Sequence, residues 1–545
     1  MRIALSVVFA AAVCAPHVRA QRLAEWPTHS GDPQRTGWQK YAPSITPESV
    51  KNFKLLWTMK FENKQKGLYS LMEPLIVGRV VTNHGFKEMA LVAGSDDNIF
   101  AIDADLGRLL WQKHFVYSSE TPQTKISTWL CPGGLTATPV VRPAPTFARR
   151  PATPSPEAAA SHPQSATPAR RPSPVRGVFV LSSDGSLHEL NLANGEDISP
   201  PLKFQPPNGK AYSLSMEDGI IYSTTAQHCA GNPNGVYSID LDSPDKKVSM
   251  FETNGGGIWG LGGPSIGSDG TIYAEAGDGA WDPAKGQYSD TVLALSPRDL
   301  KLKDWYTPTN REWITKRDLD MNTTPTVFPY KGRDLLVTAG KEGRLFMLDS
   351  KSLGGADHRT PMFRSELISN WDNVDFAGEG IWGGFATWED SKGTRWVLAP
   401  IWGAINPKVK FAAMNGDAPH GGVAAFKVEE KDGKTVLTPA WVSRDMINPA
   451  PPVVAGGVVF ALSSGEWVRQ ADETHGGLFT VEQRAAHSEH AVLYALDAET
   501  GKELWSSGDG VTSFTHFAGM AVANGRVYFA TFDNTLYSFG IPMEH

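Results

Sequence analysis

Residues 495–505 read ALDAETGKELW, and the same kind of phrase stands at residues 101–111 as AIDADLGRLLW. Around Leu496 the side chains alternate between apolar and small or polar, as they do along a β-strand. Gly501 can take a positive φ at no steric cost, so a tight turn is expected there. The stretch therefore predicts two antiparallel strands joined by a turn, the second of them ending in Trp505.

The phrase is repeated along the chain, and a repeat at a fixed spacing determines the architecture. Its eight copies end at residues 102–103, 190–191, 239–240, 295–296, 348–349, 426–427, 496–497 and 538–539. An apolar strand precedes each copy, and a strand with small residues and Pro comes before that. Four strands at roughly 50-residue spacing are typical of a propeller blade. The sequence predicts an all-β fold, an eight-bladed β-propeller of four-stranded blades.

The ends of the chain predict how the ring closes. The eighth copy, residues 534–540, has no fourth strand after it. Residues 53–61, FKLLWTMKF, form an isolated strand pattern in which Trp57 takes the place of Trp111. We expect this N-terminal strand to complete the last blade, which leaves no sheet edge exposed at the seam.

The first 20 residues resemble a secretory leader. Arg2 provides a positive start, residues 4–13 are apolar but too short to span a bilayer, and Ala20 ends a candidate cleavage site. Val13 is too bulky for the motif that would lipidate Cys14. We expect cleavage after residue 20, one propeller domain over residues 21–545, and a periplasmic or secreted protein. No later apolar run is long enough for a membrane helix.

Charge and cysteine content narrow the function classes. The formal net charge is −7, spread without blocks, which disfavours binding to nucleic acid or to an anionic membrane. After the leader the chain keeps two cysteines, Cys131 and Cys229. In an oxidising compartment a disulfide is the simplest interpretation, and two separate buried thiols are the alternative.

Two gaps between repeats are long. Residues 143–175 are rich in Pro, Ala, Ser and Arg, so we expect a disordered insertion within the second blade. Residues 465–491 fall between strands of the seventh blade and contain His475, His487, Glu489 and His490. Two of these histidines are spaced for one helical turn, but a solvated loop is preferred over a metal site.

One end of the propeller collects chemically distinctive residues. The loop before the first strand of a blade and the loop between its second and third strands share that end. In these loops lie Trp259, Asp278, Asp318, Asp320, Lys341, Trp382, Trp402 and His516. Trp faces can stack on a planar ligand, Lys can pair with a carboxylate or carbonyl, and carboxylates can hold Ca²⁺. The set suits a flat, anionic ligand with many oxygen atoms.

The repeated phrases, of the pattern A-x-D-x-x-T-G-x-x-x-W, resemble those of pyrroloquinoline quinone (PQQ) dehydrogenases. They also resemble the repeats of the propeller scaffold lipoprotein of outer-membrane protein assembly. The resemblance covers about residues 26–542. It is specific for the fold and weak for the activity, because a redox enzyme and a non-catalytic scaffold share it.

Two segments sharpen the enzymatic interpretation. GGGIWG and GDGAWDP, residues 255–260 and 277–283, are similar to the quinoprotein segment with the stacking Trp and a calcium ligand, which implies Trp259 and Asp278. DLDMNTTPTVF and AGKEGRLFMLD are similar to the segment with the catalytic Asp and the cofactor-binding Lys, which implies Asp318 or Asp320 and Lys341.

The predicted site follows from both lines of reasoning. PQQ would be bound by Trp259, Lys341, Trp382 and Trp402, Ca²⁺ by Asp278 and Asp318, and Asp318 or Asp320 would be catalytic. Such enzymes pass a hydride to the quinone while an Asp takes the alcohol proton.

The sequence also departs from this family. Residues 180–190, VLSSDGSLHEL, contain no convincing match to its Glu calcium ligand, and no vicinal Cys pair occurs. Each residue has a plain structural interpretation as well: Trp259 can pack between blades, Asp278 can form a turn, and Lys341 can be solvated. Three hypotheses follow: a dehydrogenase for an alcohol or sugar, a non-catalytic propeller that binds a protein or glycan, and a PQQ-binding protein without turnover.

Overall fold

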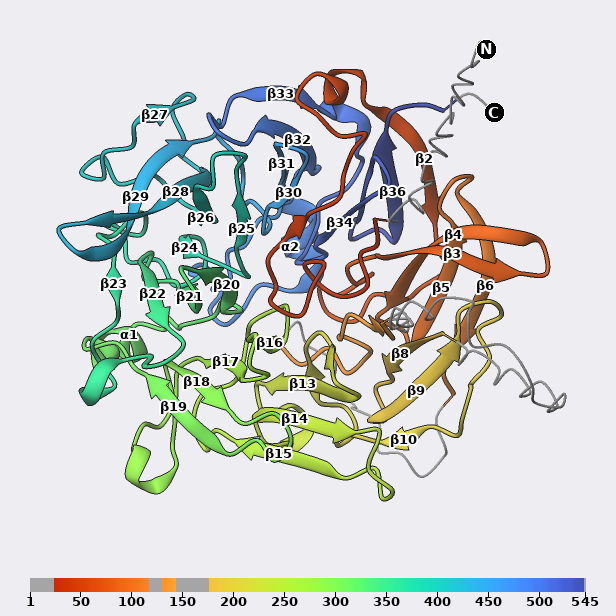
Figure 1. The fold of residues 1–545 in the computed structure, drawn as a ribbon, viewed down its shortest axis with the longest axis horizontal. Helices are drawn as coiled ribbons and strands as arrows, with labels where there is room; N and C mark the ends of the chain where they lie inside the picture. The colour runs from red at the N-terminus through yellow and green to blue at the C-terminus, as the bar shows by residue number, and fades with distance from the viewer. Residues whose placement is uncertain (1–23, 117–129, 144–175, 544–545) are drawn as a thin grey trace, which may run out of the picture.

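The computed structural model describes residues 24–116, 130–143 and 176–543. Eight antiparallel sheets surround a central axis, as Figure 1 shows. Each sheet is one blade, and each of the eight repeated phrases lies on the third strand of its blade. The predicted eight-bladed propeller of four-stranded blades is confirmed.

From the inside outward, the strands follow the expected order, with two additions: the innermost strand is split into two in blades 3 and 6, and residues Ala413–Met414 add a short parallel strand to the outer edge of blade 6. Blade 1 is built from β3 Leu75–Thr82, β4 Gly85–Gly94, β5 Asn98–Asp103 and β6 Arg108–His114, and blade 2 from β7 Val140–Val141, β8 Gly177–Leu181, β9 Ser186–Asn191 and β10 Leu202–Lys203. Blade 3 is built from β11 Lys210–Ala211, β12 Ser215–Glu217, β13 Ile220–Ala226, β14 Gly235–Asp240 and β15 Val248–Glu252, and blade 4 from β16 Ser265–Ile266, β17 Ile272–Ala276, β18 Thr291–Leu295 and β19 Leu302–Tyr306.

Blade 5 is built from β20 Thr326–Tyr330, β21 Arg333–Ala339, β22 Leu345–Asp349 and β23 Phe363–Arg364, and blade 6 from β24 Gly380–Ile381, β25 Ala386–Glu389, β26 Arg395–Trp402, β27 Ala413–Met414, β28 Gly421–Lys431 and β29 Lys434–Val442. Blade 7 is built from β30 Val453–Ala455, β31 Val458–Ser463, β32 Val492–Asp497 and β33 Glu503–Ser506, and blade 8 from β34 Met520–Ala523, β35 Arg526–Ala530, β36 Thr535–Gly540 and β2 Lys54–Lys60. The α-helices of the described part are α1 Arg311–Lys316 and α2 Val481–His487, both in loops.

The turn glycine of the repeat docks one blade on the next. Gly501 has a φ of 72°, and a Cβ built on it would lie 2.3 Å from a ring atom of Trp441 in the preceding blade. The Trp441 indole N–H donates to the carbonyl oxygen of Ala498, at 3.2 Å. Trp111 contacts Gly195 in the same way. Gly is therefore required both for the turn and for the close approach of the indole ring.

The N-terminal strand closes the ring as predicted. β2 pairs antiparallel with β36, from Lys54 opposite Gly540 to Lys60 opposite Thr535. Trp57 of this strand donates its indole N–H to the Ala104 carbonyl of blade 1, at 3.0 Å. The closing strand thus makes the contact with the next blade that the repeat makes elsewhere.

A second N-terminal element fills the central channel. Residues 26–39 pass through the middle of the ring, as the red trace in Figure 1 shows, and hydrogen bonds join them to all eight blades in turn. The hydrogen bonds, donor first and in blade order, are Trp26 N to Ile76 O, Val141 N to Pro27 O, Thr28 Oγ1 to Leu214 O, Ile266 N to Pro33 O, Val327 N to Gln34 O, Thr387 N to Thr36 O, Val454 N to Gly37 O and Gln39 Nε2 to Val522 O. Each is 2.8 to 3.0 Å long. We call this element the central segment.

Cys131 and Cys229 are joined by a disulfide between blades 2 and 3, with a sequence separation of 98.

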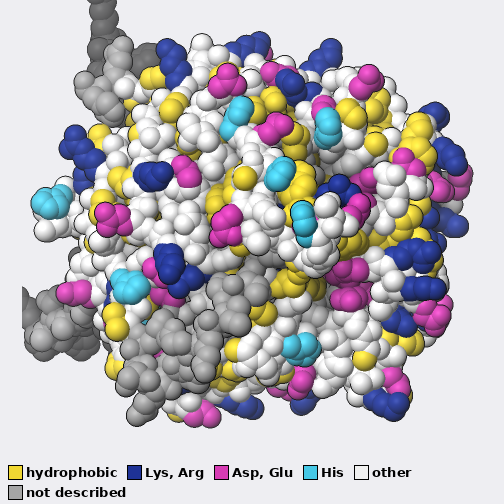
Figure 2. All heavy atoms as spheres, turned by 180° about the vertical axis from the view of Figure 1, so that it is seen from behind, with side chains coloured by type: hydrophobic (Ala, Val, Ile, Leu, Met, Phe, Trp, Pro, Cys, Tyr) yellow, Lys and Arg dark blue, Asp and Glu magenta, His cyan; other side chains and the backbone are white. Residues whose placement is uncertain are grey.

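The predicted leader, residues 1–20, and nearly all of the predicted insertion, residues 143–175, lie outside the described residues, so both stay predictions. No helix among the described residues is long and apolar enough to cross a membrane. Figure 2 shows acidic and basic side chains interspersed over one face.

Substitution of the turn glycine tests the docking contact. We expect Gly501→Ala to lower the free energy of unfolding by about 2–4 kcal/mol, because the new methyl group clashes with the Trp441 ring and the backbone keeps its positive φ. Gly457→Ala is the matched control, since Gly457 has a φ of 79° and a Cβ built at that position would meet no atom within 4 Å. It should cost only the backbone strain, about 1 kcal/mol. Urea unfolding followed by fluorescence measures both, and equal losses would contradict the docking role.

Removal of the first side chain of the central segment tests whether this segment holds the ring together. Trp26 is 1% exposed, and its indole N–H donates to Glu73 at 2.8 Å. We expect Trp26→Ala to cost about 3–5 kcal/mol of unfolding free energy, the usual loss for a buried Trp. Trp371→Ala, at a side chain that is 36% exposed, should change it by less than about 1 kcal/mol. Similar losses in the two variants would show that the segment is dispensable.

Candidate functional site

A cavity of about 360 Å³ opens at the end of the propeller where the distinctive loops were expected to meet. We call it the mouth. Its wall includes residues that directly follow second strands, such as Asp278 after β17, Lys341 after β21 and Glu466 after β31. It also includes residues that precede innermost strands, such as Trp259 and His516. The blade geometry thus brings together side chains from loops that are far apart in the sequence.

Three carboxylates form an acidic cluster on one wall. Oxygen atoms of Asp278, Asp318 and Asp320 all lie within 4.8 Å of one another. The Lys341 ammonium is 2.8 Å from Asp318 Oδ1 and 3.0 Å from Asp320 Oδ2. The Asp320 and Lys341 side chains are 4% and 8% exposed, whereas Asp318 is 49% exposed. The structure therefore brings together all four charged residues predicted for the site.

Burial and the mutual repulsion of the carboxylates raise the pKa of two of them. Burial, and then the charges of Asp320 and Asp318, raise the pKa of Asp278 to about 7. Burial and Asp320 also raise the pKa of Asp318. Burial alone would lower the pKa of Lys341, but Asp320 and Asp318 raise it. One ammonium group thus compensates the cluster only in part.

Several buried polar atoms beside the cluster have no hydrogen-bond partner in the described part of the protein. They are Asp320 Oδ1, the side-chain oxygen and nitrogen of Asn322, and the indole nitrogen of Trp259. Asn322 is 4% exposed and lines the mouth. A buried polar atom without a partner is costly, so these atoms indicate a place for a ligand.

Aromatic rings form a second wall. The rings of Trp382 and Trp402 stack at a centroid distance of 4.8 Å, and Phe517 stacks on Trp402 at 6.0 Å. The indole N–H groups donate to the backbone, Trp382 to Glu379 O at 2.8 Å and Trp402 to Pro449 O at 2.9 Å. The rings are therefore fixed in orientation and present apolar surface to the mouth.

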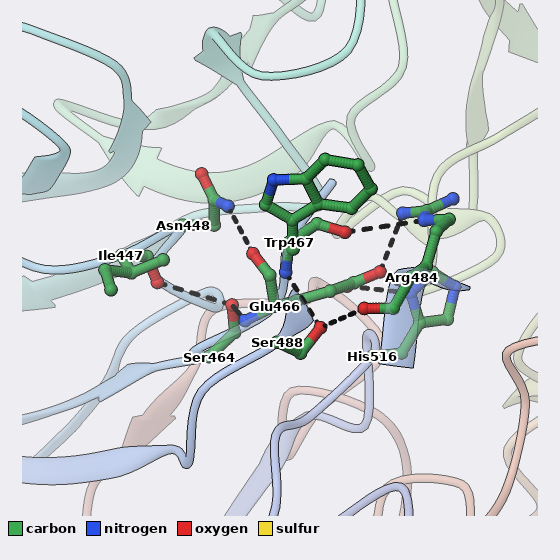
Figure 3. A network of polar contacts seen from close by, with 8 residues as sticks. All are labelled: Ile447, Asn448, Ser464, Glu466, Trp467, Arg484, Ser488 and His516. Atoms are coloured by element: carbon green, nitrogen blue, oxygen red, sulfur yellow. Dashed lines mark hydrogen bonds and ion pairs between the residues drawn. The ribbon is translucent and has the colours of Figure 1, made fainter. Parts of the chain in front are cut away.

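A buried ionic network forms the third wall, shown in Figure 3. Glu466 accepts from Arg484 Nη2 at 2.8 Å and from His516 Nδ1 at 2.8 and 2.9 Å. Its own backbone oxygen accepts from Asn448 Nδ2 at 2.8 Å. Arg484 is supplied by α2, which begins at a capping box of Thr480 and Gln483. Helix α2 thus places a cation over the mouth.

The sequence interpretation missed several lining residues. These are Tyr69, Lys210, Tyr212, Gln227, Glu466 and Arg484. Gln227 and Glu466 occupy the position after the second strand that supplies Asp278 and Lys341 in other blades, so the same rule applied to every blade would have found them. Arg484 depends on the path of a loop helix, which the repeat does not specify.

The histidines of residues 465–491 do not form a shared site. His475 contacts Asp472 at 3.0 Å, His487 donates to the Gln483 carbonyl at 2.7 Å, and His490 lies 3.5 Å from Asp509. None of residues 180–190 lines the mouth, and Glu189 instead pairs with Arg142 at 2.7 Å. The described residues of the second blade therefore supply no carboxylate to the acidic cluster.

Comparisons with known proteins support the fold. No protein-family model and no curated protein matches the sequence. Among solved structures, a quinohemoprotein alcohol dehydrogenase from Comamonas testosteroni is 14% identical, with a TM-score of 0.57 over 97% of this chain and 82% of that one. A quinohemoprotein alcohol dehydrogenase, ADHIIG, from Pseudomonas putida HK5 is 13% identical, with a TM-score of 0.56 over 96% and 82%. A europium-containing methanol dehydrogenase is 13% identical, with a TM-score of 0.56 over 95% and 98%. The chain shares the propeller fold of quinoprotein alcohol and methanol dehydrogenases.

Loss of the central carboxylate tests the ionic wall. We expect Glu466→Ala to lower the unfolding free energy by about 3–5 kcal/mol, because two buried groups lose the charge that they contact. Glu473→Ala is the control: its partner is Arg469, and the two side chains are 79% and 61% exposed. It should cost less than about 0.5 kcal/mol. Chemical denaturation measures both, and a loss in Glu466→Ala as small as the control would contradict the structural role of the network.

Proposed function

We propose that the mouth binds PQQ together with Ca²⁺ and that the protein is a quinoprotein-type dehydrogenase for an alcohol or sugar. The observation that carries this proposal is one cavity that combines a cluster of three carboxylates, a buried Lys and stacked Trp rings. The shared fold of quinoprotein dehydrogenases supports it. Bound PQQ would supply a two-electron acceptor and Ca²⁺ a Lewis acid.

The acidic cluster fits a hard divalent cation. Ca²⁺ takes six to eight oxygen ligands, mostly from carboxylates and amides. Asp278, Asp318 and Asp320 offer carboxylates, and Asn322 adds an amide oxygen without a partner in the described part. When all three carboxylates are ionised, they exceed the Lys341 ammonium by two negative charges, which matches a divalent ion. We assign Asp278, Asp320 and Asn322 to the metal, with Asp320 the most deeply buried of the three carboxylates.

The remaining walls fit a planar, multiply oxygenated ligand. A volume of about 360 Å³ lies within the ~300–1,000 Å³ typical of ligand sites. Trp259, Trp382 and Trp402 supply ring faces, and Lys341 supplies a cation for a carbonyl or carboxylate. Leu261 lines the mouth and also borders a small void against the central segment.

Asp318 is the better candidate for the catalytic base. Its side chain is half exposed to the mouth and bonds to Lys341 through Oδ1. Asp320 is buried and points its second oxygen into the cluster. A substrate hydroxyl in the mouth can therefore reach Asp318 and transfer its proton there. Periplasmic or secreted localisation is part of the proposal, supported by the Cys131–Cys229 disulfide.

Titration of the purified protein with PQQ tests the proposal. We expect quenching of tryptophan fluorescence that depends on Ca²⁺ and is weakened about 10-fold or more in Trp259→Ala and in Lys341→Ala. Asp278→Asn should raise the Ca²⁺ concentration that is needed. Trp371→Ala, outside the mouth, is the control and should bind as the wild type does.

The outcomes separate the three hypotheses. Uptake followed by dye-linked oxidation of an alcohol or sugar supports the dehydrogenase. Uptake without turnover of any alcohol or sugar supports a PQQ-binding protein. If PQQ is not taken up, the dehydrogenase and the PQQ-binding hypotheses are both contradicted, and a propeller that binds a protein or glycan is favoured. The contacts of Lys341 with two carboxylates are also consistent with that third hypothesis.

A further inference from the structure

Lys210 places a buried positive charge in the mouth. It belongs to β11, which with β12 forms the inner edge of blade 3, and it is 5% exposed. Within residues 24–116, 130–143 and 176–543, its side chain has no hydrogen-bond or ion-pair partner. Lys is almost never buried without a partner, so this charge requires an explanation.

The other buried cations of the mouth are compensated. Lys341 contacts Asp318 and Asp320, and Arg484 contacts Glu466. The Lys210 ammonium lies instead over two aromatic faces, 4.8 Å from the ring centroid of Trp259 and 5.5 Å from that of Tyr69. Cation–π contacts stabilise the ammonium, but they provide no negative charge.

The surroundings of Lys210 contain donors and no described acid. Tyr69 and Tyr212 line the same part of the mouth, and burial raises the pKa of both phenols, so both hydroxyls stay protonated. Burial also lowers the pKa of Lys210 to about 7. An anionic ligand would restore the charged form and satisfy the ammonium, because an opposite charge offsets the cost of desolvation.

We propose that Lys210 anchors a carboxylate subsite, in which an aromatic acid places its ring against Trp259 and its carboxylate on the Lys210 ammonium. The carboxylate can belong to PQQ or to a separate aromatic acid. The inference rests on the proposed function only for the PQQ case. The subsite and the acidic cluster prefer ligands of opposite charge. A carboxylate would be repelled by Asp278, Asp318 and Asp320 and attracted by Lys210.

A matched pair of small probes tests the subsite without any cofactor. 2-Naphthoate and 2-naphthalenemethanol have the same ring, but only the first carries a charge. We expect Lys210→Met to weaken the binding of 2-naphthoate about 10-fold or more, as measured by calorimetry, and to leave the neutral alcohol unchanged. Lys203→Met is the control, since that side chain is 79% exposed, and Lys210→Arg should retain affinity for the acid.

The pH dependence of the same titration gives an independent readout. Because burial depresses the pKa of Lys210 to about 7, the free protein holds the charged form below that pH and loses it above. The affinity for 2-naphthoate should therefore fall above pH 7, with proton uptake on binding. His516 stacks edge-on against Tyr69 and pairs with Glu466, so the dependence belongs to Lys210 only when Lys210→Met abolishes it.

Stability distinguishes loss of the subsite from misfolding. Removal of an uncompensated buried charge should raise the midpoint of thermal unfolding in Lys210→Met, and 2-naphthoate should stabilise the wild type alone. Equal affinity of wild type and Lys210→Met for 2-naphthoate would overturn the proposal, as would equal losses for the acid and the alcohol.

The PQQ arm separates this inference from the proposed function. PQQ and its trimethyl ester are compared on wild type and Lys210→Met. Tighter binding of the free acid that is lost in the variant assigns a PQQ carboxylate to Lys210. Binding of 2-naphthoate without PQQ uptake contradicts the proposed function but supports the subsite. PQQ uptake that is indifferent to Lys210→Met, together with no naphthoate binding, overturns the subsite alone.

Discussion

The hydrogen bonds of the central segment are the constraint on which the rest of the structure depends. In a ring of sheets, each blade packs only on its two neighbours, and the inner edges of the innermost strands face an open channel. Residues 26–39 give each of these edges a partner, from Trp26 in blade 1 to Gln39 in blade 8. The segment therefore fixes all blades to one common element. The mouth adjoins the segment through Leu261, which lines the mouth and also a small void bordered by His29 and Ser30.

The ring itself could be predicted, because its causes are local. A turn glycine, an alternating strand and a terminal Trp lie within 11 residues, and the contact of Trp57 with Gly107 repeats in other blades. The closing strand was predictable for the same reason. The central segment was not, since its partners are mostly backbone groups of strands distant in the sequence, and backbone hydrogen bonds leave no side-chain pattern to detect.

The site was predictable to the extent that blade geometry determines it. Position after a second strand or before a first strand places Asp278, Asp320 and Lys341 together regardless of their separation in sequence. Lys210 has the same kind of position, but a single Lys beside small residues carries no motif. Its significance comes from its burial and from the lack of an acid beside it among the described residues, which are properties of the packed structure.

The charges that line the mouth are only partly compensated by one another. The acidic cluster has one ammonium for three carboxylates, the Glu466 network pairs its charges, and Lys210 stands without an acid in the described part. The excess charges have opposite signs and lie on different parts of one cavity lined by aromatic rings. A ligand that binds a cation through oxygen atoms and also carries a carboxylate would satisfy both excesses at once. A neutral ligand would leave both excess charges uncompensated. We therefore expect the electrostatics of the mouth to favour the ligand with a carboxylate and a bound cation over a neutral one.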